Sequence, residues 1–360
     1  MDSEIVTEDL RIHTSPRFHH RLFFWFFLAT LSMVLPEVMT LNDPIPWATP
    51  MGWELGYPIY GLHIIALAGL MYHKPIGGMA ALLAFGGLFG LYEGYMIKQL
   101  WNPTWGVEQA WDTIGGVQPM HTLMLVFWLH PLMAYILPLF LTERLMVKPG
   151  RLTHRFKYIL QSKSGTRFLL AGTAIYCGLS IGSKLSSESE MVIPLTSVAV
   201  LSGLGLFWRF VLRGGRFRLE ELLPQGKTLV AVWVMLIFSY LHYGSTLRRE
   251  ALPTALLPHL LVWLIYLFLI GTIIAVTRRT RPLSDKLDEI KGWGNRRTVI
   301  IAAATFFIFL LVIRIHLPST EPGSVIILLS FFLGGFVNII FLALTLLKSV
   351  FGSKPAAASE

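Results

Sequence analysis

Two ionisable side chains lie deep inside apolar stretches of this sequence. Glu93 falls within the apolar run 80–100, and His130 lies at a similar depth in the next run, 120–143. A carboxylate near the centre of a bilayer costs roughly 2.5 to 3.5 kcal/mol, so an acid in such a position is a functional candidate by default. A carboxylate and an imidazole can together accept and donate protons. We therefore expect Glu93 and His130 to form a site.

Further histidines extend this set. His63 lies at comparable depth in the run 57–72 and is a candidate catalytic residue with Glu93 and His130. Because imidazole and carboxylate groups bind metals, the candidate metal ligands are His63, Glu93, His121 and His130, with a divalent ion possible but no cofactor firmly implied. His121 precedes His130 by nine residues, which is half a turn off its face on a straight helix. Paired haem ligation by His63 and His130 is geometrically permitted.

A row of glycines should hold Glu93 inside the bundle. Gly86, Gly90 and Gly94 form a series of small residues four apart, which permits close contact between helices. Glu93 follows Gly90 by three residues and shares that face. The alternative is a protonated acid that only hydrogen-bonds a neighbouring helix.

Prolines should distort the helix that carries His130. Pro131 and Pro138 remove backbone N–H groups, which predicts a kink with freed carbonyls near this depth. His130 could cap one of those carbonyls instead of doing chemistry. Lys98 is expected to extend to the outer surface. We expect four further side chains at the outer interface, namely Glu37, His242, His259 and His316.

The composition identifies the environment of these residues. Apolar residues make up 54% of the 360 residues, charged residues only 14%, and mean hydropathy is +0.60. Such values indicate an integral membrane protein. The formal charge of +9 is scattered between apolar segments without a nucleic-acid motif, so lipid headgroups and not nucleic acid are the expected partners. The one cysteine, Cys177, rules out an internal disulfide.

The apolar runs predict an all-α, polytopic transmembrane bundle of about ten spans, with eight or nine also possible. The runs are 22–40, 57–72, 79–100, 120–143, 167–185, 191–212, 228–245, 254–277, 298–316 and 324–350. This predicts a cytoplasmic N-terminal segment 1–21, a transmembrane domain 22–350 with the candidate site in 57–145, and a cytoplasmic tail 351–360.

The distribution of Lys and Arg residues between the two sides supports this topology. When alternate connections are assigned to the inside, most of the 30 Lys and Arg residues fall there, as cytoplasmic loops require. The outer side keeps Lys98, Lys184, Arg248, Arg249 and Arg314. Both termini are therefore predicted to be cytoplasmic, and Glu93 and His130 are placed in the outer half of the bilayer.

Residues 80–145 resemble the CPBP family, which is related to the CAAX prenyl proteases, in a poorly characterised prokaryotic branch. The similar pieces are LLAFGGLFGLYEGYMIKQLWNPTW and HPLMAYILPLFLTERL. The resemblance implies an intramembrane protease in a prokaryotic plasma membrane, with Glu93 as general base, His130 as its partner or an oxyanion stabiliser, and a membrane-embedded peptide as substrate. The sequence departs from the family pattern, because Tyr92 stands where a second glutamate is expected and the nearest cation, Lys98, is displaced by one residue.

Several functions therefore remain open. The first is a CPBP-like hydrolase centred on Glu93 and His130. The second is a non-catalytic transporter, or a membrane subunit of a larger complex with partner chains, in which the buried acid handles protons or ions. A haem- or quinone-binding subunit is a third, and a purely structural role for these polar groups is a fourth.

Overall fold

The computed structural model describes residues 15–40, 45–73, 77–103, 113–182, 192–280 and 320–351, with a few positions between 300 and 312. The site is built from six consecutive elements near the N-terminus, which are α1 (Phe18–Thr40), η1 (Gly52–Gly61), α2 (Leu62–His73), α3 (Met79–Met96), α4 (Pro119–Met124) and η2 (Leu125–Ile136). The fourth span continues through α5 (Leu137–Leu141) and η3 (Thr142–Met146), and α6 (Arg151–Arg155), α7 (Lys157–Leu160) and α8 (Lys163–Gly182) follow it. The rest comprises α9 (Val192–Leu206), η5 (Phe207–Val211), η6 (Gly214–Arg216), α10 (Leu219–Leu222), α11 (Gly226–Thr246), η7 (Arg249–Ala251), α12 (Leu256–Arg279) and α14 (Thr320–Phe351).

The all-α polytopic prediction is confirmed. Across the ranges described, every regular element is a helix, and eight helices are long and apolar enough to cross a membrane. These are Phe18–Val38, Gly52–His73, Met79–Met96, Pro119–Met146, Pro194–Val211, Gly226–Thr246, Leu256–Arg279 and Leu328–Phe351. The predicted run 167–185 forms α8, which is not among these eight, and the predicted run 298–316 lies almost wholly outside the described residues.

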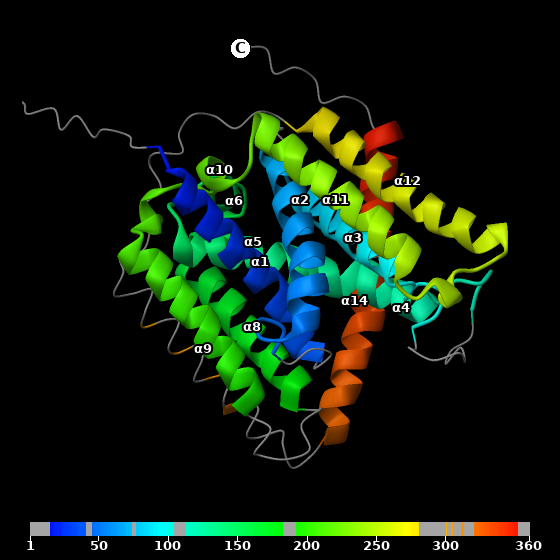
Figure 1. Cartoon of the computed structure of the whole chain (residues 1–360), viewed down its shortest axis with the longest axis horizontal. Coiled ribbons are helices and arrows are strands. Elements are labelled where there is room, and N and C mark those ends of the chain that lie inside the picture. The colour runs from blue at the N-terminus through cyan, green and yellow to red at the C-terminus, as the bar shows by residue number, and fades with distance from the viewer. Residues whose placement is uncertain are drawn as a thin grey trace, which may run out of the picture.

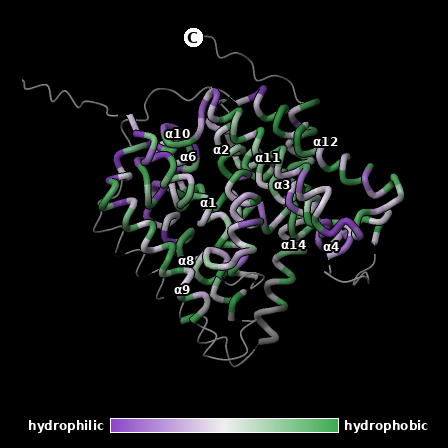
Figure 2. The backbone as a smooth tube through the Cα atoms, viewed as in Figure 1, coloured by the Kyte–Doolittle hydropathy of each residue, from purple (hydrophilic) through white to green (hydrophobic). Residues whose placement is uncertain are grey.

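The centre of the bundle is α3, packed against η2. Buried residues make up 83% of the apolar stretch of α3 but only 17% of those in α11, α12 and α14. Figure 1 shows α11 and α12 on one side of α2 and α3, and α8 and α9 beside α1 on the other. The hydropathy colouring in Figure 2 shows hydrophobic residues along α11 and α12 and hydrophilic ones around α6, α10 and α4. A bundle of this kind exposes apolar helix faces outward and keeps its polar groups inside or at its ends.

The fourth span contains Pro131 and Pro138, which lack backbone N–H groups, and neighbouring helices donate to two carbonyls near them. The amide of Asn338 on α14 donates to the Phe127 carbonyl at 2.7 Å. The Ser32 hydroxyl on α1 donates to the Ala134 carbonyl at 2.6 Å, which is the acceptor that the N–H of residue 138 would have in an α-helix. These bonds tie the distorted span to both neighbours.

The second span repeats this arrangement. Pro58 lies inside η1 and lacks the N–H that would reach the Glu54 carbonyl. The hydroxyl of Tyr243 on α11 donates to that carbonyl. Both η1 and η2 are π-helical and contain a proline, and π-helical segments are frequent at functional sites. Each of these segments contributes a side chain to the site.

Candidate functional site

Glu93 and His130 meet inside the bundle. The Nε2 atom of His130 on η2 lies 2.6 Å from Oε2 of Glu93 on α3, and their side chains are 1% and 8% exposed. Glu93 and His130, which the sequence placed at one depth, are therefore also in direct contact across the two helices. This separation is that of a close ion pair, and neither atom has another hydrogen-bond partner among the described residues.

The second ring nitrogen of His130 determines how many protons the pair holds. Nδ1 lies 3.1 Å from the carbonyl of Leu125, which can only accept, so Nδ1 must carry a hydrogen. Nε2 and the facing Glu93 oxygen then need one more proton between them. That proton makes either an imidazolium beside a carboxylate or a neutral histidine beside a carboxylic acid. The pair is thus a site for one proton.

Glycines allow this contact. A Cβ on Gly90 would lie 2.3 Å from the Leu125 carbonyl oxygen and 3.0 Å from Cβ of His130. A Cβ on Gly86 would lie 2.4 Å from Cα of Pro131. The predicted glycine face of α3 is therefore the face that packs on η2, and side chains there would force the two helices apart.

Tyr60 extends the site toward α1. Its hydroxyl lies 2.7 Å from Oε1 of Glu37 and 3.2 Å from Oε1 of Glu93, and it is the donor to both. Because a phenol has a single proton, it bonds to one carboxylate at a time and can exchange between them. Glu37, expected at the interface, thus belongs to the network. Sequence reasoning missed Tyr60, although its position three residues before His63 places both on one helix face.

His63 lies beside the pair without contacting it. Its Nδ1 bonds to the carbonyl of Ile59, and Nε2 has no hydrogen-bond partner among the residues described. The Phe89 ring stacks on His63 at 4.8 Å between centroids and packs against His130 at 5.6 Å. His63 therefore forms part of an aromatic layer next to the site.

A cavity of about 490 Å³ reaches the pair. It lies where α1 and α3 end and where η1 and α4 begin, the end of the bundle that the charge pattern assigns to the outside. Its polar lining is Glu37, Tyr60, Glu93, Gln99, His121 and His130, and the remainder is mostly apolar, including Met33, Met51, Met124 and Phe331. Among the described residues of the lining, two are acids and none is a lysine or an arginine.

Comparison with known proteins identifies the family. Residues 26–357 match an uncharacterized membrane protein family. The chain belongs to this family. A relative described as an uncharacterized protein, from Archaeoglobus fulgidus, is 30% identical over 288 residues, covering 80% of this chain and 86% of the relative. No solved structure matches.

This membership overturns the CPBP resemblance. The family match covers almost the whole chain, whereas the resemblance concerned only residues 80–145 and lacked the second glutamate at Tyr92. An acid and a histidine on successive spans are too common a device to define a family by themselves. The hydrolase expectation that came with the resemblance has no support, and the chain is a multi-pass membrane protein.

The four candidate metal ligands do not form a cluster. In the part of the chain that the structure describes, no three His, Cys, Asp or Glu residues converge as a metal site. Glu93 and His130 are paired with each other, His63 lies behind Phe89, and His121 lines the cavity. The donor set for the expected divalent ion is therefore incomplete here.

Lys98 does not extend to the surface as predicted. It is fully buried in a left-handed conformation with φ 58°, and its ammonium donates to the carbonyls of Tyr243, at 3.2 Å, and Leu247. These carbonyls end α11, where a cation is favourable. The prediction was wrong because this partner lies 149 residues away in the sequence.

Proposed function

We propose that this membrane protein is a proton-coupled transporter whose coupling proton binds to the Glu93 and His130 pair. The observation that carries the proposal is the 2.6 Å contact between Nε2 of His130 and Oε2 of Glu93, with Nδ1 held by the Leu125 carbonyl. At that separation the carboxylate and the imidazole nitrogen need one proton between them. A buried acid and base in this arrangement is a common proton-relay device in pumps and transporters.

Access to the proton supports the proposal. The cavity touches Glu37, Tyr60, Glu93 and His130, so water entering it would reach both ends of the polar chain. Tyr60 can pass a proton between Glu37 and Glu93 by rotating its hydroxyl between hydrogen bonds of 2.7 and 3.2 Å. The site thus combines a buried proton with a route by which it can leave.

The cavity lining indicates the class of solute. Among the described lining residues no lysine or arginine compensates Glu37, and the Glu93–His130 pair becomes negative when it loses its proton, so the lining should attract cations. The methionine side chains are polarizable and adaptable, and they suit an irregular apolar body. We propose a small organic cation with an apolar body as the solute. Such a cation near Glu93 would favour the carboxylate and so displace the proton.

We further propose that the membrane is a prokaryotic plasma membrane with the cavity facing outward. The support is the excess of Lys and Arg in the connections on the opposite side. The exposed apolar faces of α11, α12 and α14 would then contact lipid.

The experiment measures displacement of the proton by a cation. Tetraphenylphosphonium is added to the purified protein in weakly buffered detergent that contains a pH indicator. Wild type should release about one proton per chain, and Glu93→Gln should release none. Glu54→Gln is the matched control, because Glu54 is an exposed acid on the same span as Tyr60 and does not line the cavity. Equal release from wild type and Glu93→Gln, or no release from wild type, would overturn the proposal.

A further inference from the structure

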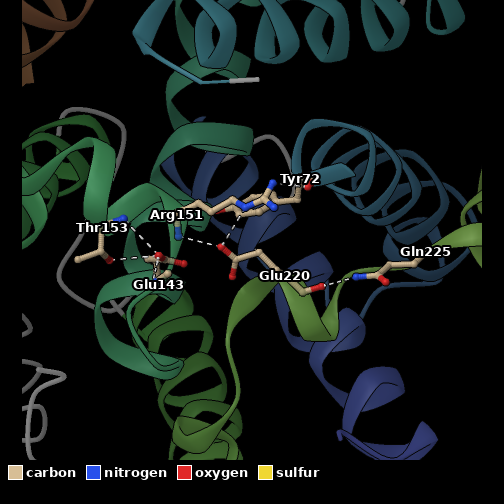
Figure 3. A network of polar contacts seen from close by, with 7 residues as sticks. Tyr72, Glu143, Arg151, Thr153, Glu220 and Gln225 are labelled. Carbon is tan, nitrogen blue, oxygen red and sulfur yellow. Dashed lines mark hydrogen bonds and ion pairs between the residues drawn. The ribbon is translucent and has the colours of Figure 1, made fainter. Parts of the chain in front are cut away.

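A second pair of acids lies at the other end of the span that carries His130. Glu143 on η3 follows His130 by 13 residues, which is roughly 20 Å along a helix. Glu220 approaches it from α10. Figure 3 shows both acids beside the start of α6, where Thr153 and Arg151 contact them. The charge pattern assigns this end to the cytoplasm, so the acids lie on the opposite side from the cavity.

Consecutive backbone amides bind the two carboxylates. The N–H of Gly150 donates to Oε1 of Glu143 at 2.6 Å, and the N–H of Arg151 donates to Oε1 of Glu220 at 2.8 Å. The amide and hydroxyl of Thr153 also donate to Oε1 of Glu143, both at 3.2 Å. All of these bonds converge on one oxygen of each acid.

The other oxygens form an unsatisfied polar group. Oε2 of Glu143 and Oε2 of Glu220 are buried and have no hydrogen-bond partner among the described residues. Tyr72 on α2 supplies an independent third group, because it is only 7% exposed, its hydroxyl also has no partner there, and both carboxylates act on it electrostatically. A buried polar atom without a partner costs about 1 to 3 kcal/mol. Two of these atoms are carboxylate oxygens, which can share a proton.

The acids are too close to be charged independently. A Cβ on Gly150 would lie 2.6 Å from Oε2 of Glu220 and 3.1 Å from Oε1 of Glu143, so both carboxylates flank this glycine. Because both oxygens lie within about 3 Å of one point, they are at most about 6 Å apart, a separation at which like charges disfavour double ionisation.

The nearby positive charge is weak. Arg151 approaches Glu220 only at 3.9 Å and donates instead to the Tyr72 carbonyl at 2.6 Å. Arg144 on Glu143's own segment donates to Thr166. Titratable groups on other elements near the pair include Tyr72 on α2 and Arg151 on α6, and Tyr135 on η2 acts on Tyr72.

We propose that Glu143 and Glu220 form a second proton-binding site, in which the two carboxylates share one proton. The bound proton turns one carboxylate into a neutral acid that can donate a hydrogen bond within the group of Glu143, Glu220 and Tyr72. The backbone amides of Gly150 and Arg151 remain bonded in either state. This site depends only on its own contacts and stands whether or not the outer pair couples transport.

Infrared spectroscopy of the full-length protein tests the proposal. A protonated carboxyl has a C=O stretch that shifts in D₂O, and it should be present at neutral pH in wild type. Glu220→Gln and Glu143→Gln should each lose this band, because the remaining acid can then ionise on its backbone amides. Glu221→Gln is the matched control, since Glu221 is the neighbouring acid on α10 and bonds only to the Arg218 amide. Glu93→Gln should retain the band, which separates this site from the outer one.

Glu220→Gln should disturb folding less than Glu143→Gln, because Glu220 is 17% exposed and glutamine keeps the oxygen that accepts a hydrogen bond from the Arg151 amide. An unchanged carboxyl band in Glu220→Gln would overturn the proposal. A band absent from wild type at neutral pH would overturn it as well.

Discussion

Lys98, which follows α3, caps the C-terminus of α11, and Arg248, which follows α11, caps the C-terminus of α3. Lys98 follows α3, and its ammonium donates to the carbonyls of Tyr243 and Leu247 at the end of α11. Arg248 follows α11, and its guanidinium donates to the Ile97 carbonyl at the end of α3 at 2.8 Å. Both residues have positive φ, 58° and 49°. The exchange fixes the outer ends of two spans and agrees with the prediction that both cations lie on the same side.

Lys98 should make stability depend on pH. Burial, reinforced by the charge of Arg248, lowers the pKa of Lys98 from 10.5 to about 8. Between these values the unfolded chain keeps Lys98 protonated while the folded protein does not, so stability should rise with pH over this interval. We expect the melting temperature in detergent, measured from pH 8 to pH 10, to rise more in wild type than in Lys98→Met. Parallel curves for the two proteins would show that Lys98 does not titrate there.

The Ser32 hydroxyl should contribute to the stability of the protein only because Pro138 is present. Ser32→Ala leaves the Ala134 carbonyl without its donor and should destabilise the protein by about 1 to 3 kcal/mol. In a Pro138→Ala background, the new backbone N–H can bond to Ala134, so the same substitution should cost much less. Chemical denaturation of the four proteins measures the coupling. Equal costs in both backgrounds would contradict this assignment of the bond.

Gly90 should resist substitution far more than a helical glycine in open space, such as Gly271. Gly90→Ala places a Cβ 2.3 Å from the Leu125 carbonyl and should move η2 away from α3, with loss of the Glu93 contact and of proton release. Gly271→Ala on α12 is the control, since no atom lies within 4 Å of its Cβ position. The control should gain about 0.5 to 1 kcal/mol of stability. Tolerance of Gly90→Ala with full proton release would argue against close helix contact.

The sequence predicted the depth of the site but only some of the residues that form it. Apolar run length fixes the span, and charge asymmetry fixes the side, so Glu93 and His130 could be placed at one depth. Their lateral contact depends on helix rotation, for which the glycines at 86 and 90 were the only guide. Tyr60 gives no comparable indication, because a tyrosine in an apolar run is ordinary.

Tyr60→Phe should separate proton transfer from proton binding. The variant removes the donor to Glu37 and Glu93 but leaves the contact with His130, so the number of bound protons should not change. Proton uptake after a rapid pH step should slow on the order of a hundredfold, as for loss of a positioned acid–base group. Tyr57→Phe is the matched control, because its hydroxyl bonds to Thr30 outside the network. An unchanged uptake rate in Tyr60→Phe would show that protons reach Glu93 by another route.

The most direct measurement is ¹⁵N NMR of histidine-labelled protein, with His130 assigned from the loss of its resonances in His130→Gln. In wild type, His130 should show a proton bound to Nδ1 and a proton shared between Nε2 and Glu93, as we infer from the 2.6 Å contact. Glu93→Gln should remove the shared proton and leave a neutral imidazole that is protonated only at Nδ1. The account is contradicted if the His130 resonances are the same in wild type and in Glu93→Gln.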